Sequence, residues 1–121
     1  MSSIALWVAV GVLGGLGSIA RFLLDGLVST NTGARFPLGT LVVNLSGCVV
    51  LGLLVGIALS GNAYLLAGTA VIGSYTTFST WLLESHRLAE DGRRWVLAAN
   101  IVLSLVLGVA AAALGRLIGG G

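Results

Sequence analysis

The sequence predicts an all-α membrane protein with four transmembrane helices in a single domain of 121 residues. The first observation behind this is the composition: 57% of the residues are hydrophobic and 8% are charged, whereas soluble domains carry about 25% charged residues. The second is that four long apolar segments follow one another along the chain. Because a backbone in lipid must satisfy its own hydrogen bonds, and no strand pattern is visible, these segments are predicted to be helices.

A spanning helix needs about 20 mostly apolar residues, and the segments that meet this requirement are 4–24, 38–59, 63–83 and 95–118. The first has no positive charge before it, which is atypical of a cleavable signal peptide, so it is interpreted as a retained helix. The second follows Pro37, a residue suited to the start of a helix. The third and fourth are joined by the charged segment 84–94.

The arginines are unevenly distributed between the two predicted faces of the membrane. Five belong to one face: Arg21, Arg35, Arg87, Arg93 and Arg94. Arg116 alone belongs to the other. The positive-inside rule therefore predicts that the five-arginine face is cytoplasmic and that both termini lie outside.

Small residues four apart recur at Gly11 and Gly15 and at Gly52 and Gly56. Such pairs let helices approach closely in lipid, so tight helix packing is predicted. Four helices leave little room for a path lined by protein, and a transport function would need at least a dimer.

Polar residues recur inside the predicted spans. Thr40 and Asn44 are four apart and share a helix face, and Asn100, Ser104 and Gly108 form a stripe on the fourth span. One such residue commonly bonds to a neighbouring helix. Stripes on several helices together favour a shared polar pathway.

The most specific stretch is "GSYTTFSTW", residues 73–81. Gly73 and Ser74 are poor helix formers, and the hydroxyls that follow compete for backbone hydrogen bonds, which predicts a break in the third helix at mid-membrane. A break is tolerated where it lines a cavity, and freed carbonyls can bind a cation. The ring edges of Phe78 and Trp81, three residues apart, are electropositive and can meet an anion.

The titratable residues favour an anion as the passing species. Asp25 and Glu84 lie at span ends, and no carboxylate lies within a span. Arg21 is a permanent cation that is partly buried in this prediction. The lone Cys48 has no partner for a disulfide or a metal site, and His86 is interpreted as a solvated loop residue.

Three segments resemble the signature segments of the Fluc, or CrcB, fluoride channels: "GGLGSIARF" (14–22), "PLGTLVVNLSG" (37–47) and "GSYTTFSTW" (73–81). The resemblance covers essentially the whole chain. It implies an antiparallel, dual-topology dimer in the bacterial inner membrane, with two pores that passively export cytoplasmic fluoride. It further implies a structural sodium ion at the dimer centre, held by the backbone carbonyls of Gly73 and Thr76.

The resemblance also implies roles for individual side chains. Asn44 would donate its amide to fluoride, Phe78 and Trp81 would present ring edges, and Arg21 would lie at the vestibule. The remaining pathway residues are hydroxyls and an amide: Thr77, Ser79, Asn100 and Ser104.

The chain departs from the family pattern at three positions. Ser74 stands where a second glycine is usual, Trp81 where phenylalanine is usual, and Gly108 where a hydroxyl is frequent. The arginine bias also leaves two assemblies open: a homodimer, which is favoured, and a heterodimer with an oppositely oriented paralogue.

Two other functions are compatible with a four-span chain of this length. A small multidrug-type exporter works through a buried carboxylate, which the first span lacks. A non-transporting membrane subunit would have no use for a broken helix. An enzyme is not predicted, because no nucleophile–base set, metal cluster or phosphate loop is visible. The small, scattered net charge of +2 does not indicate nucleic acid.

Overall fold

The computed structural model describes residues 2–32 and 36–121, and this part of the chain is all-helical. Three helices are long and apolar enough to cross a membrane: α1 (Ser3–Thr32), α2 (Leu38–Gly56) and α6 (Arg94–Ile118). Between α2 and α6 lies a segmented helix made of α3 (Gly61–Tyr64), the π-helix η1 (Leu65–Ile72), α4 (Gly73–Tyr75) and α5 (Phe78–Glu90). The four-helix, all-α class is therefore as predicted.

The helix α1 runs beyond the predicted span 4–24 and into the segment predicted to connect the first two spans. Local side-chain bonds support this polar extension: Ser29 Oγ donates to Asp25 Oδ1 at 3.2 Å, and Thr30 Oγ1 donates to Gly26 O at 2.7 Å. Hydropathy marks where the apolar part stops, but these i to i+4 contacts let the helix continue. Arg35, which contributed to the predicted arginine bias, lies outside the described residues.

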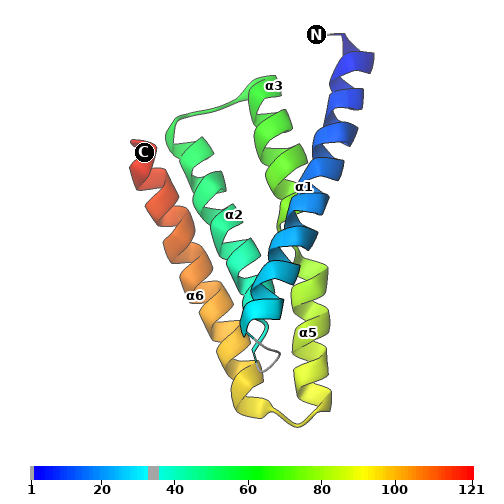
Figure 1. The fold of residues 1–121 in the computed structure, drawn as a ribbon. Coiled ribbons are helices and arrows are strands. Elements are labelled where there is room, and N and C mark those ends of the chain that lie inside the picture. The colour runs from blue at the N-terminus through cyan, green and yellow to red at the C-terminus, as the bar shows by residue number, and fades with distance from the viewer. Residues whose placement is uncertain (1, 33–35) are drawn as a thin grey trace.

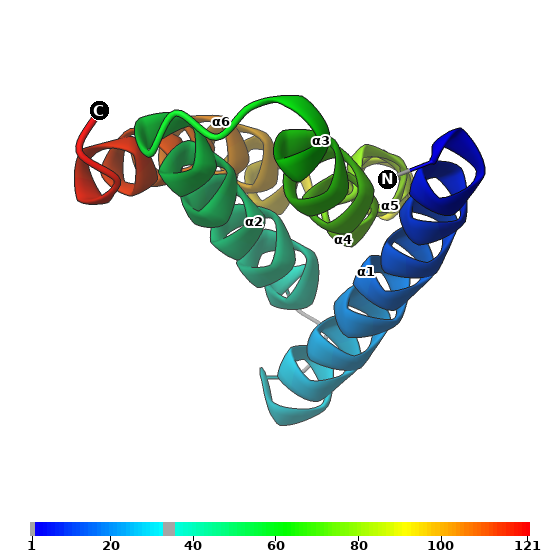
Figure 2. The same ribbon diagram turned by 90° about the horizontal axis from the view of Figure 1, so that it is seen from above.

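The helices α2 and α6 lie side by side along most of their length, and α1 crosses the face formed by α2, η1 and α4 (Figures 1 and 2). Both termini lie at one end of the molecule, and the α5–α6 turn lies at the other (Figure 1). This turn contains Gly92, whose φ of 71° is in the left-handed region that favours glycine.

Glycines create the close contact between α2 and α6. A Cβ built on Gly52 would lie 2.1 Å from Ala112 O, and one on Gly115 would lie 1.9 Å from Val49 O. The close packing predicted for Gly52 and Gly56 is thus confirmed within the chain. At Gly11 and Gly15 a Cβ would meet no atom of the described residues within 4 Å, so neither glycine lies at a close helix contact in this part of the chain.

The buried core is small and partly polar. Val43, Thr40 and Asn100 are the largest fully buried side chains in the described residues, whereas large apolar side chains such as Trp95 (89% exposed) face outward. Outward apolar side chains suit a helix surrounded by lipid, and the buried polar ones need partners within the protein.

Candidate functional site

The third helical segment is broken where the sequence predicts it. Thr76 (φ −75°, ψ 158°) and Thr77 (φ −145°, ψ 120°) are extended and separate α4 from α5. Each threonine caps one side of the break: Thr76 Oγ1 donates to Ile72 O at 3.1 Å, and Thr77 Oγ1 accepts from Thr80 N at 3.2 Å. The Thr77 hydroxyl therefore satisfies an N–H that the break leaves without a helical partner, whereas the Thr76 hydroxyl adds a second bond to Ile72 O, which also accepts from Thr76 N at 3.0 Å.

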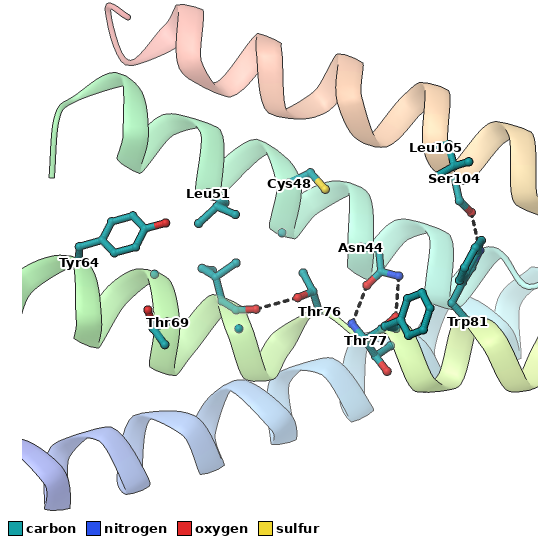
Figure 3. Close-up of a pocket in the computed structure, with 15 residues that line it drawn as sticks. Asn44, Cys48, Leu51, Tyr64, Thr69, Thr76, Thr77, Trp81, Ser104 and Leu105 are labelled. Carbon is teal, nitrogen blue, oxygen red and sulfur yellow. Dashed lines mark hydrogen bonds between the residues drawn. The ribbon is translucent and has the colours of Figure 1, made fainter. Parts of the chain in front are cut away.

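Asn44 of α2 fixes the break from the side. Its Oδ1 accepts from Thr77 N at 2.8 Å, and its Nδ2 donates to Thr77 O at 2.9 Å (Figure 3). The amide thus satisfies both backbone groups of one extended residue. An amide nitrogen carries two hydrogens, and the second one has no acceptor among the described residues.

The segment before the break is wound as a π-helix, in which Gly73 N donates five residues back to Gly68 O. Single-turn π-helical segments are rare and are frequent at functional sites. Ser74, which replaces the usual glycine, donates its Oγ to Ala70 O at 2.6 Å. Its side chain fits because it faces Gly17 of α1, where a Cβ would lie 2.3 Å from Ser74 Oγ.

The break leaves four consecutive carbonyls without a hydrogen bond from any described residue: Gly73 O, Ser74 O, Tyr75 O and Thr76 O. Thr77 N, which would bond to Gly73 O in a continuous helix, bonds to Asn44 instead, and Thr80 N is taken by the Thr77 hydroxyl. Gly73 O and Thr76 O, the carbonyls that the resemblance assigned to sodium, are two of these four.

An aromatic pair follows the break. The ring centroids of Phe78 and Trp81 are 5.5 Å apart with planes tilted by 45°, an arrangement within the favourable range for aromatic pairs. The Trp81 indole Nε1 donates to Ser104 Oγ of α6 at 2.9 Å (Figure 3). The Phe78 side chain is 70% exposed in the single chain.

These groups meet in one cavity of about 510 Å³, lined by 15 residues (Figure 3). The predicted site residues among them are Asn44, Gly73, Thr76, Thr77, Phe78, Trp81 and Ser104. No acidic or basic side chain belongs to this lining. The cavity therefore combines amide and hydroxyl groups with aromatic edges and apolar walls, without a carboxylate to repel an anion.

Three predicted site residues lie outside the lining of the cavity. Ser79 Oγ is 3.4 Å from Thr77 Oγ1 on the exposed side of α5. Asn100 is buried and donates its Nδ2 to Ser85 Oγ at 2.9 Å, which joins α6 to α5. Arg21 is partly exposed on α1 and forms no ion pair or hydrogen bond with another described residue.

Two contacts of the site were not predicted. Thr40 is buried and donates to the Glu84 carboxylate, and Ser46 Oγ lies 2.8 Å from Tyr75 Oη. Thr40 and Asn44 are four apart on α2, so their spacing marks one face of that helix, but it does not indicate which residues of another helix lie opposite.

Comparison with known proteins places the chain in a family. The model of the family described as "CrcB-like protein, Camphor Resistance (CrcB)" matches residues 8–116. A protein of Mycolicibacterium paratuberculosis named "Fluoride-specific ion channel FluC 2" is 56% identical over 116 residues, which cover 96% of this chain and 95% of that protein.

Two further relatives carry the same kind of name. A "Fluoride-specific ion channel FluC 2" of Mycobacterium bovis is 52% identical, covering 94% of this chain and 90% of that protein. A "Fluoride-specific ion channel FluC 1" of Symbiobacterium thermophilum is 39% identical, covering 95% and 98%. Together with the apolar helices, this similarity identifies a multi-pass protein of the bacterial plasma membrane. The chain belongs to the CrcB-like family.

Proposed function

We propose that this protein is a fluoride-selective channel, which lets cytoplasmic fluoride leave the cell passively and so protects against its toxicity. The observation that carries the proposal is the uncharged cavity at the break, where amide and hydroxyl donors from α2 and α6 face the same space. Relatives at 52 and 56% identity are named fluoride-specific ion channels, which supports the same function.

The chemistry of the cavity suits fluoride. Fluoride is small and strongly hydrated, so a pore must replace lost water with closely spaced donors. The unused hydrogen of the Asn44 amide and the Ser104 hydroxyl supply such donors, and the edges of Phe78 and Trp81 add weaker positive potential. The hydroxyls of Thr77 and Ser79 are close enough to extend this path.

Selectivity against chloride follows from a narrow path with short hydrogen bonds, because a larger ion gains less from each donor. Asn100 lies outside the cavity and contributes to its shape, because its hydrogen bond to Ser85 holds α6 against α5. Arg21 contributes positive potential near the entrance rather than a contact within the cavity.

The assembly we propose is an antiparallel, dual-topology homodimer, in which the third helix of each copy also crosses the membrane. The exposed Phe78 ring and the open cavity beside it support this, because a second copy would complete their surroundings. A heterodimer with an oppositely oriented paralogue is the alternative assembly.

The donor set fits the sodium ion that the family resemblance implies. The carbonyls of Gly73 and Thr76, which no described residue hydrogen-bonds, would hold it, and hard cations prefer such oxygen ligands. When bound, the ion would supply a fixed positive charge near the pathway.

An efflux assay tests the proposed function. Liposomes that contain the purified chain are loaded with potassium fluoride or potassium chloride, and ion release is followed with selective electrodes. We expect rapid fluoride release and little chloride release from the chain alone. Equal release of both ions would reject fluoride selectivity, and proton-coupled drug export or the absence of any flux would support the alternative functions.

A labelling experiment tests the dual topology. In a Cys48→Ala background, a Gly121→Cys substitution places one thiol at the C-terminus. An impermeant thiol reagent should label comparable fractions of the chains from the outside of intact cells and from the outside of inverted membrane vesicles. Labelling from one side alone would contradict dual topology and favour the heterodimer.

A further inference from the structure

The serine and threonine hydroxyls of these helices follow a common pattern that Ser104 does not share. Several donate to a backbone carbonyl three or four residues earlier in the chain: Thr30, Ser46, Ser74, Thr76 and Ser85. Such a bond uses the hydroxyl hydrogen locally. Ser104 Oγ instead accepts a hydrogen bond from the Trp81 indole, and no described residue accepts its own hydrogen.

The chemistry of indole fixes the direction of this bond. The indole nitrogen is a donor without acceptor capacity, so Ser104 must be the acceptor across the 2.9 Å contact. A hydroxyl that accepts one hydrogen bond keeps its hydrogen and becomes a stronger donor, because hydrogen bonds in a chain polarise one another. Trp81 therefore leaves Ser104 with a donor available to a third group.

The surroundings hold Trp81 in place on two sides. Its ring packs against Phe78, and its backbone carbonyl accepts from Ser85 Oγ at 2.9 Å. Ser85 in turn accepts from the buried Asn100, which lies one turn before Ser104 on α6. The indole and Ser104 are thus fixed relative to each other from both helices, and both line the cavity.

We propose that Trp81 is a positioning residue for the anion: its indole N–H holds Ser104 so that the hydroxyl donates its hydrogen to fluoride in the cavity. This inference rests on the proposed function. The indole N–H then does not contact the ion, and Trp81 acts on it through Ser104. A phenylalanine at this position, the usual residue in related channels, would leave the serine oxygen without this donor and allow the hydroxyl to turn toward its own helix.

A double-mutant cycle in fluoride-loaded liposomes tests the proposal. Trp81→Phe and Ser104→Ala should each lower fluoride efflux and the fluoride-to-chloride ratio by about tenfold, the scale of one hydrogen bond to a charged group. The double variant should be no worse than Ser104→Ala alone, because both changes remove the same donor. Trp95→Phe, a change at a side chain that is 89% exposed on α6, should leave both quantities unchanged.

The cycle separates this inference from the proposed function. If the unmodified protein passes both ions equally, the proposed function fails. If it is selective but the losses in the cycle are additive, or Trp81→Phe changes nothing, the positioning role is overturned while the channel function stands. If the Trp81–Ser104 bond only joined α5 to α6, its loss in the variants would lower thermal stability without changing the fluoride-to-chloride ratio. That result would also overturn the positioning role of Trp81.

A fluorescence measurement decides the case if Trp81→Phe does not fold. The chain has three tryptophans, so Trp7→Phe with Trp95→Phe leaves Trp81 as the reporter. Sodium fluoride should change its emission, and sodium chloride at equal concentration should not. The change should persist in Ser104→Thr and be lost in Ser104→Ala. A fluoride response that survives in Ser104→Ala would refute the coupling.

Discussion

At the scale of single residues, Asn44 performs two tasks with one amide. It satisfies both backbone groups of Thr77 and still has a hydrogen to offer to the cavity. The family resemblance predicted the second task, whereas the first became visible in the structure. An amide can do both because it carries an acceptor and two donor hydrogens in one plane.

Replacing Asn44 by aspartate should therefore abolish fluoride efflux. An ionised carboxylate cannot donate to Thr77 O, and it places a negative charge where the anion must pass. We expect a loss of at least tenfold in the liposome assay. Asn62→Asp, the same change at an exposed position of α3, serves as the matched control. Normal selective efflux from Asn44→Asp would show that this amide is not on the path.

Glu84 illustrates a residue whose partner the sequence did not indicate. It was predicted to lie at the end of a span, yet its carboxylate accepts from the buried Thr40 hydroxyl. The sequence marked both residues, but only the docking of α5 on α2 brings them together. Periodicity identifies a face of one helix and says nothing about which face of another helix lies opposite.

Removing this carboxylate should destabilise the fold. Glu84→Ala leaves the buried Thr40 hydroxyl without its acceptor, at a cost of about 1–3 kcal/mol. Glu84→Gln keeps an acceptor oxygen and should cost less. Thermal unfolding in detergent should rank Glu84→Ala lowest, with Glu90→Ala, an exposed partner of His86, close to the unmodified protein. Equal melting temperatures for all variants would contradict a stabilising role for Glu84.

At the scale of helices, the sequence predicted the break well and the winding around it poorly. The run of glycine, serine and threonine residues at 73–80 indicated where the helix stops, because these side chains compete with the backbone. The π-helix before the break had no such signal. At its start the Tyr64 ring packs over Gly68, four residues further along the same segment, where a Cβ would lie 3.2 Å from the ring.

Adding one methyl group at Gly115 should destabilise the contact between α2 and α6, whereas adding one at Gly108 should not. A Cβ on Gly115 would lie 1.9 Å from Val49 O, a backbone atom that cannot move aside. Overpacking of this kind costs about 1–3 kcal/mol, so Gly115→Ala should lower the melting temperature in detergent.

Gly108 on the same helix is the matched control. The nearest atom to its added Cβ would be Cys48 Sγ at 3.9 Å, an ordinary contact. Gly108→Ala should be neutral or slightly stabilising, because alanine is the better helix former. If Gly115→Ala and Gly108→Ala have the same melting temperature, the packing of α2 on α6 does not require a glycine at position 115.

At the scale of the whole molecule, the sequence predicted the class, the number of helices and the family, because composition and signature segments extend along the entire chain. Other features depend on what surrounds the chain. Gly11 and Gly15 have the spacing of a packing pair, but a Cβ at either would meet no described atom within 4 Å, and Phe78 is mostly exposed. A spacing in one sequence does not say whether its partner is another helix, lipid or a second copy.

The proposed sodium ion links the assembly to conduction and supplies the last prediction. In the proposed site one chain would supply the carbonyls of Gly73 and Thr76, fewer oxygens than the six or so that comparable hard cations take, and the proposed dimer would let a second copy supply others. Protein purified and reconstituted in sodium-free choline buffer should therefore lose fluoride efflux and shift from dimer to monomer, and added sodium should reverse both changes. Gel filtration with light scattering and the efflux assay measure the two effects on one sample. Full fluoride efflux from a stable dimer without sodium would show that sodium is not needed for conduction. Loss of efflux without dissociation of the dimer would show that sodium acts on the ion pathway and not on the assembly.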